Sequence, residues 1–352
     1  MVNVQPHLNC DKSTGGYGIG CGSQGASAGT AIGSIANRIM MFAQEIAPSM
    51  TSATGLTAIA IDPQANLDFY TGVVGLRLVE LTLNFDSPDV YHFYFADEAG
   101  RPGTILTFFP FTMARGRSGA GMVDAVTFAV PASALESWML RLTEHGIEFD
   151  GPMPRFTDAV IAFRDPDGLK LEIIAREDRS SGDALYGFDG VTPCVEVPER
   201  TANLLTETFG YRQVGEDSGR MRYSAAGEDS TPGRNIDILC QPEAMRRRPG
   251  GGTVHHVAFR AHDDAELAAW RERIAALGFD VTPVRDRQYF HSIYFREPGG
   301  ILFEIATDPP GFAVDEPVDR LGTSLKLPPW LEGRRATIEP RLPPVRLPGA
   351  TP

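Results

Sequence analysis

The feature that most constrains the fold is a segment that occurs twice. Residues 163–173 (Phe-Arg-Asp-Pro-Asp-Gly-Leu-Lys-Leu-Glu-Ile) align without a gap with residues 295–305 (Phe-Arg-Glu-Pro-Gly-Gly-Ile-Leu-Phe-Glu-Ile). A short alternating strand, an amphipathic helix and a glycine precede each copy. Such self-similarity predicts a repeated supersecondary unit, whose copies bury their apolar faces against one another.

The two clear copies have the same order of strand, helix and terminating glycine. The strand 126–130 leads into a helix that starts at Leu135 and ends before Gly146, and the strand 257–261 leads into a helix from Leu267 that ends before Gly278. Apolar residues recur at helical spacing, with a capping residue at the start and glycine just past the end. Each copy is therefore expected to fold as β-α-β-β-β.

Two fainter copies complete the pattern. The first runs from the strand 57–61 into a helix capped by Asp62 with Pro63 at its first position, and the third starts at Val191 with its helix near Leu204. One such unit leaves a face of its sheet uncovered, so the units must pair. The sequence thus predicts an α+β fold of four βαβββ modules.

Paired βαβββ modules resemble the vicinal oxygen chelate superfamily, which includes glyoxalases and extradiol dioxygenases. Within it, the chain is similar to hydroquinone-type ring-cleaving dioxygenases at 62–70, 91–110, 292–300 and 325–331. The resemblance covers roughly 54–340 and implies two barrels. We place the first in 50–178 (modules one and two), the second in 186–310 (modules three and four), and a Pro-rich arm in 311–352.

Strand alternation selects a candidate metal pair. Val257 and Phe259 have the character of residues that pack under the helix, which turns His256 toward the barrel interior. The same reasoning turns Glu304 inward. A buried carboxylate is costly unless it binds a metal or pairs with a cation. We expect His256 and Glu304 to bind one metal; the alternative is that Glu304 pairs with Arg287 and His256 is only hydrogen-bonded.

The resemblance implies one more histidine ligand from the first module, but Thr54 and Gly55 stand where a His-His pair is expected. Gly55 occupies the strand position that His256 holds in the fourth module. The remaining candidates for the third position are water and four histidines. Of these, His92 is better explained as a cavity or core residue, and His291 is expected to face outward. The four are His7, His92, His255 and His291.

The other implied site residues are His255, Arg287 and Tyr294. His255 or Tyr294 would handle the proton, and Arg287 would hold phenolate or superoxide charge. The preferred function is cleavage of a hydroquinone or catechol ring with O₂ at Fe(II), with Mn(II) as the alternative metal. Two rivals remain: a glyoxalase-like metal-dependent lyase or isomerase, and a metal-free protein that binds an aromatic compound.

Composition limits the partners. The formal charge of −13 argues against nucleic acid or an anionic membrane, and no apolar run is long enough to span a bilayer. Four cysteines without CxxC spacing indicate a reduced, cytoplasmic setting. The expected partners are a small aromatic substrate and O₂, and the sequence leaves a homo-oligomer open.

Both ends differ from the modules. Residues 1–49 are expected to form a dispensable flexible tail, because they are rich in glycine. The glycine-rich run 16–22 follows no strand, so it does not predict a phosphate loop. Met50 directly precedes the first patterned segment. The arm is expected to lie extended on the surface, with Trp330 as its anchor.

Overall fold

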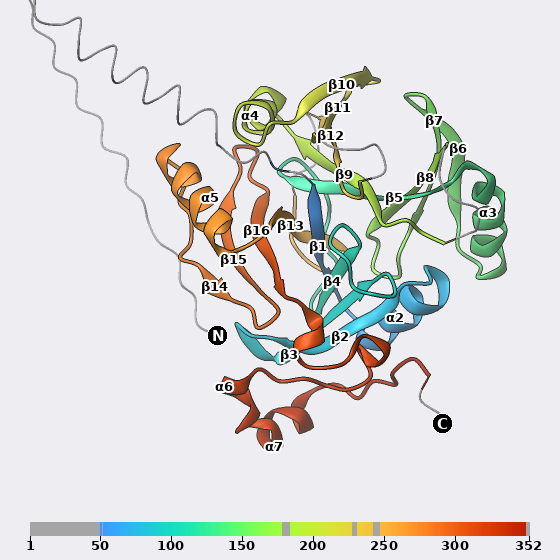
Figure 1. Ribbon diagram of the computed structural model, residues 1–352. Coiled ribbons are helices and arrows are strands. Elements are labelled where there is room, and N and C mark those ends of the chain that lie inside the picture. Colours follow the sequence, from blue (N-terminus) through green and yellow to red (C-terminus); the bar gives the residue numbers. More distant parts are fainter. Residues whose placement is uncertain (1–49, 51, 178–183, 227–230, 242–246, 350–352) are drawn as a thin grey trace, which may run out of the picture. The chain divides into compact units, whose positions relative to one another are not determined.

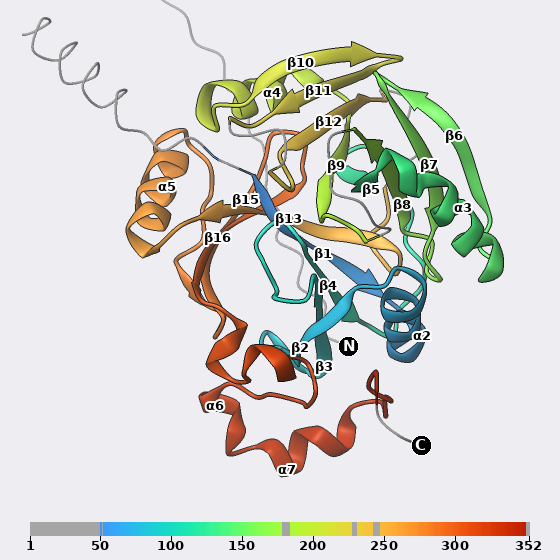
Figure 2. The ribbon, with the colours of Figure 1, turned by 45° about the vertical axis from the view of Figure 1, so that its right-hand side comes forward.

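The computed structural model describes residues 50–349 except 51, 178–183, 227–230 and 242–246. Predictions that concern the tail 1–49, including His7 as a ligand, lie outside the described residues. From Met50 onward the described residues form one compact unit. Two eight-stranded sheets make up most of this unit (Figures 1 and 2).

The first sheet joins the first and fourth modules through the antiparallel pair β1 and β13. Its strands, in spatial order, are β14 (Arg285–Asp286), β15 (Phe290–Arg296), β16 (Leu302–Pro310), β13 (Thr253–Ala261), β1 (Ala53–Ala60), β4 (Ile105–Pro110), β3 (Ser87–Ala96) and β2 (Arg77–Asn84).

The second sheet joins the second and third modules through β5 and β9 in the same way. Its strands, in spatial order, are β10 (Arg212–Asp217), β11 (Arg220–Ser224), β12 (Asn235–Cys240), β9 (Phe188–Val195), β5 (Met122–Pro131), β8 (Lys170–Arg176), β7 (Asp158–Arg164) and β6 (Phe149–Arg155).

Four paired βαβββ modules were predicted, and the structure has them. The sheets, however, combine modules across the two expected ranges, because each of 50–178 and 186–310 contributes one module to each sheet. Cross-strand pairing is set by contacts between residues far apart in sequence, which the pattern within a module does not report. The boundaries of those ranges stay a prediction.

Each module carries one helix at the expected place. The helices are α2 (Pro63–Asp68), α3 (Leu135–Glu144), α4 (Pro198–Asn203) and α5 (Asp264–Ala276). Wider π turns, Phe69–Val73 and Leu204–Thr208, extend α2 and α4. The Asp62 carboxylate caps α2 by accepting from the Ala65 amide at 2.8 Å.

A glycine with positive φ follows each helix and turns the chain back toward the sheet. Gly146 after α3 has φ 68°, and Gly278 after α5 has φ 87°. Glycine adopts this left-handed conformation without the steric cost that a side chain brings. Each helix therefore ends where the sequence places a glycine, because the backbone there needs a positive φ.

The C-terminal arm is partly helical, with α6 (Pro329–Glu332) and α7 (Arg335–Ile338), rather than extended. Trp330 is 49% exposed and touches Phe85 edge-on, so it is not the main anchor. Aliphatic side chains anchor the arm instead, because they can be buried without polar groups to satisfy. The buried ones are Leu327, Leu331, Ile338 and Leu342.

No helix among the described residues is both long and apolar enough to cross a bilayer.

Candidate active site

An aromatic-lined cavity lies in the first sheet, between the strands of modules one and four. It holds about 350 Å³ and has His256 and Glu304 in its wall. Its lining comes from β1, β3, β4, β13, β15 and β16 and from the loop around Phe312. Most of the large side chains in it are aromatic: Phe85, His92, Tyr94, Phe109, Phe111, Tyr289, Phe290, Tyr294 and Phe312.

His256 and Glu304 meet in this cavity. His256 Nε2 lies 2.9 Å from Glu304 Oε2, and both side chains are almost fully buried. The alternation predicted for β13 holds, because Val257 and Phe259 are completely buried in the core on its other face. Burial alone would raise the pKa of Glu304, but the charge of His256 and hydrogen bonds from His256 and Tyr294 lower it.

Tyr294 and Arg287 lie next to the pair. The Tyr294 hydroxyl donates to Glu304 Oε1 at 2.5 Å and accepts from Arg287 Nε at 3.3 Å. Arg287 also forms an ion pair with Asp86 at 3.0 Å. The alternative in which Arg287 neutralises Glu304 directly is therefore not what the structure shows, since Tyr294 stands between them.

His255 lies at the mouth of the cavity. Its side chain is exposed, and its Nδ1 is 2.8 Å from Nδ1 of His256. Although part of the side chain meets solvent, the cavity wall desolvates the ring, and this desolvation and, next, His256 lower the pKa of His255, so its imidazole is neutral near pH 7. A metal needs the lone pair of His256 Nε2, and His256 Nδ1 can then carry the ring proton and donate it to His255.

Sequence reasoning missed a hydrogen-bonded chain on the other side of His256. The Nε2 atom of His256 is hydrogen-bonded to Thr57 Oγ1 at 2.8 Å. Thr57 is in turn bonded to Thr107 at 2.8 Å, and Thr107 to His92 Nε2 at 2.8 Å. Only the cross-strand register reveals this chain, because Thr57 faces His256 across β1 and β13. His92 is a cavity residue, as expected, and its pKa is lowered by burial and by His256.

His291 faces outward, as the alternation predicted, and pairs with Asp264 at 2.6 Å. Within the described part of the chain, no three His, Cys, Asp or Glu side chains come together as a metal cluster. The residues present fit a divalent ion as two of its ligands, an imidazole nitrogen and a carboxylate oxygen that face each other. The remaining positions would be left to water, substrate or O₂.

Gly55 lines the cavity and has little room for a side chain. A Cβ built on it would lie 2.8 Å from the Ile105 carbonyl oxygen of the neighbouring strand β4. Contacts this short do not occur in real structures without a shift of the backbone. The local packing of β1 on β4 is thus fitted to glycine.

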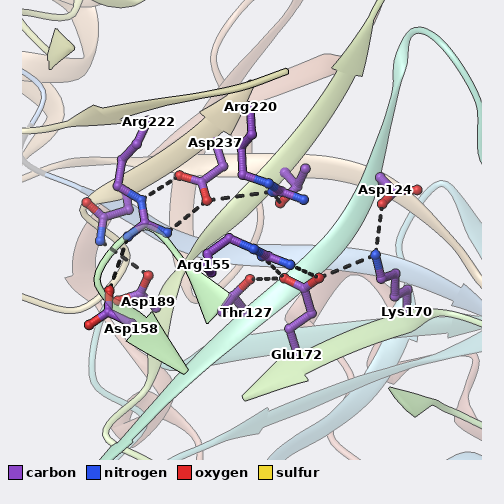
Figure 3. A network of polar contacts seen from close by, with 12 residues as sticks. Asp124, Thr127, Arg155, Asp158, Lys170, Glu172, Asp189, Arg220, Arg222 and Asp237 are labelled. Carbon is purple, nitrogen blue, oxygen red and sulfur yellow. Dashed lines mark hydrogen bonds and ion pairs between the residues drawn. The ribbon is translucent and has the colours of Figure 1, made fainter. Parts of the chain in front are cut away.

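The second sheet carries the counterpart of the site, and arginines fill it (Figure 3). Glu172 pairs with Thr127 across β5 and β8 in the register that Glu304 has with Ala258. Both carboxylate oxygens of Glu172 accept from Arg155, at 2.6 and 3.0 Å. Asp237 on β12 is held in the same way by Arg222, at 2.7 and 2.8 Å. These carboxylates are already neutralised by arginines, and among the described residues neither is paired with a histidine.

Comparison with known proteins agrees with the geometry. The model of the Glyoxalase/Bleomycin resistance protein/Dioxygenase superfamily matches residues 55–173 and 187–305. The chain belongs to this superfamily. The predicted resemblance and the paired-module fold are thereby confirmed.

Several relatives are similar over nearly their whole length. MhqO of Bacillus subtilis, named as a ring-cleaving dioxygenase, is 46% identical over 295 residues, which is 81% of this chain and 93% of MhqO. The chlorohydroquinone/hydroquinone 1,2-dioxygenase of Sphingobium indicum is 32% identical over 305 residues, covering 81% and 91%. A crystal structure named as a Bacillus subtilis dioxygenase superposes with a TM-score of 0.81, at 44% identity over 86% of this chain and 99% of that one.

Proposed function

We propose that the protein is a metal-dependent dioxygenase that cleaves the ring of a hydroquinone- or catechol-like aromatic compound with O₂. One observation carries the proposal: His256 and Glu304 face each other at 2.9 Å in an aromatic-lined cavity, beside Tyr294 and Arg287. Relatives named as ring-cleaving and hydroquinone dioxygenases support it. Fe(II) is the proposed metal, with Mn(II) as the alternative.

The protein's own contribution is to bind, orient and handle protons. His256 and Glu304 would hold the metal, and the aromatic walls would orient the substrate ring and exclude water. Arg287 offers a fixed positive charge to a substrate phenolate. His255, which lines the cavity and is neutral near pH 7, can accept a hydrogen bond from a substrate hydroxyl, and it or Tyr294 would handle the substrate proton. When bound, the metal would bring substrate and O₂ together for electron transfer between them.

The glyoxalase-like lyase and the metal-free binder remain the alternatives, and O₂ consumption separates them. A cytoplasmic setting with a small aromatic substrate as the main partner belongs to the same proposal. It is supported by the free thiols of Cys194 and Cys240.

The first prediction is that the His256→Ala and Glu304→Ala variants each lose stoichiometric metal and oxygen uptake. Loss of a residue that only hydrogen-bonds to a metal ligand already costs about 10–100-fold in metal affinity, so loss of a ligand itself is expected to cost more than about 100-fold. The variants should keep the wild-type circular dichroism, because open catalytic sites contribute less to folding than closed structural ones. Metal analysis and oxygen electrode measurements on anaerobically purified protein provide the readout.

The matched control is His262→Ala. His262 forms the same kind of pair with Glu266, at 2.8 Å, but on the surface and away from the cavity. It should keep full metal content and oxygen uptake. Full metal in both cavity variants would refute the metal pair. Metal-dependent turnover without O₂ would favour the lyase, and neither metal nor turnover in the wild type would favour the binder.

A further inference from the structure

The two halves of the cavity carry equivalent tyrosines. Tyr94 on β3 pairs in register with Thr107 on β4, and Tyr294 on β15 pairs with Glu304 on β16. The order of strands around the β1–β13 pair is the same on both sides. Tyr94 therefore has the place in module one that Tyr294 has in module four, and both rings line the cavity.

Their hydroxyls differ in how they are used. The Tyr294 hydroxyl is bound to Glu304 and Arg287. For the Tyr94 hydroxyl the structure gives no hydrogen-bond partner among the described residues, although the side chain is only 2% exposed. This hydroxyl is not one of the described polar atoms that are buried without a partner, so it opens on the cavity, where a hydrogen bond to a ligand oxygen would contribute about 0.5–1.5 kcal/mol.

The Tyr94 ring is held in place by packing. Its centroid lies 4.0 Å from that of His92, 5.2 Å from Phe312 and 6.1 Å from Tyr289. Burial and, next, the charge of Glu304 raise the pKa of Tyr94 well above its usual value. The hydroxyl is therefore a fixed donor that stays protonated at neutral pH, with little entropy to lose when a ligand binds.

We propose that the Tyr94 hydroxyl donates a hydrogen bond to a second oxygen substituent of the aromatic substrate, and that it selects dihydroxylated rings over monophenols. The proposal rests on the proposed function for the class of substrate. One ring oxygen would face His256 and Glu304 on the module-four side. Tyr94 lines the module-one side of the same cavity, and in the proposed pose its hydroxyl would meet the second oxygen of the ring. A monophenol has no second ring oxygen to accept from this donor, so it would lose the net energy of that hydrogen bond.

The test is binding without O₂, so that no turnover is needed. Hydroquinone and phenol are titrated by calorimetry into wild-type protein and Tyr94→Phe, both purified anaerobically with their metal. A net hydrogen bond of about 1–1.5 kcal/mol predicts that the variant binds hydroquinone about 5–12-fold more weakly. Phenol affinity should not change. The wild-type preference for hydroquinone over phenol should fall by the same factor.

Tyr91→Phe is the matched control. Tyr91 lies on β3 but faces the core, and its hydroxyl donates to the Pro343 carbonyl at 3.0 Å. This variant should bind both ligands like the wild type. Unchanged hydroquinone affinity in Tyr94→Phe, an equal loss for both ligands, or no binding of either ligand to the wild type would each overturn the inference. Selective binding without oxygen uptake would instead reject the proposed reaction and leave the Tyr94 contact intact.

Discussion

At the scale of single residues, Gly55 decides what the metal site can become. The sequence suggests that histidine at this position would restore a missing ligand. The structure adds a cost, because any Cβ at 55 would press on the Ile105 carbonyl, which is backbone and cannot rotate away. The strands β1 and β4 must separate before a side chain fits.

We therefore predict that Gly55→Ala destabilises the protein by about 1–3 kcal/mol, the usual range for overpacking a core. Urea unfolding followed by circular dichroism measures it. Gly72→Ala is the control, since a Cβ there meets nothing within 4 Å and should be neutral or slightly stabilising. Any gain of metal in Gly55→His must be judged against this cost. Equal stability of Gly55→Ala and wild type would show that the strands give way easily.

The residue scale also shows what the sequence could predict of the site. Period-two alternation placed His256 and Glu304 inside, because each lies in a strand whose neighbours are plainly apolar. The chain of Thr57, Thr107 and His92 was missed, since small polar residues in strands carry no pattern of their own. Their meeting depends on the register between β1, β4 and β13, which only the structure supplies.

At the scale of elements, equivalent strands of the two sheets place their carboxylates in different surroundings. The β8 position that matches Glu304 holds Glu172, and Arg155 on β6 binds it at two points. Burial would raise the pKa of Glu172, but Arg155 and then Lys170 lower it to about 2. The second sheet is thus stabilised by ion pairs where the first sheet keeps a cavity.

Glu172→Gln is expected to destabilise the protein by about 3–5 kcal/mol at pH 7, because it leaves the charge of Arg155 buried and unmatched. Since the folded pKa is depressed, the stabilisation is present above the unfolded pKa near 4.5 and is lost as pH falls toward 2. Denaturant titrations at pH 7 and at acid pH should therefore show the two proteins converging on acidification. A matched substitution of the exposed Glu98, which pairs loosely with Arg77, should have no measurable effect. A small loss for Glu172→Gln would mean that water reaches Arg155.

At the scale of the whole molecule, the first module and the C-terminal arm meet around Glu80. This carboxyl is fully buried on β2 near the Tyr289 hydroxyl, but neither of its oxygens makes a hydrogen bond of normal geometry to a described residue. Burial and the nearby charges of Asp315 and Glu316 raise the pKa of Glu80 to about 8. Glu80 is therefore neutral in the folded protein at pH 7.

A raised carboxyl pKa makes folding less favourable as pH rises. Between the unfolded pKa near 4.5 and the folded value of about 8, the folded state holds a proton that the unfolded state has released, so stability falls across this range. We predict that Glu80→Gln, which stays neutral, raises the melting temperature more at pH 8.5 than at pH 5. Calorimetry at both values checks this. An equal shift at both would show that Glu80 titrates normally.

The joining of first and last modules also determines when the site can exist. Thr57 and His256 are hydrogen-bonded although 199 residues separate them, whereas modules two and three are adjacent in the chain. During synthesis the inner pair can close first, because its contacts span a shorter loop. The outer pair has to wait until β16 has left the ribosome. A nascent chain that stalls before Glu304 would therefore carry a finished second sheet, no metal site, and a first sheet whose edge at β13 is open, because β16 is missing, so that another chain could pair with it.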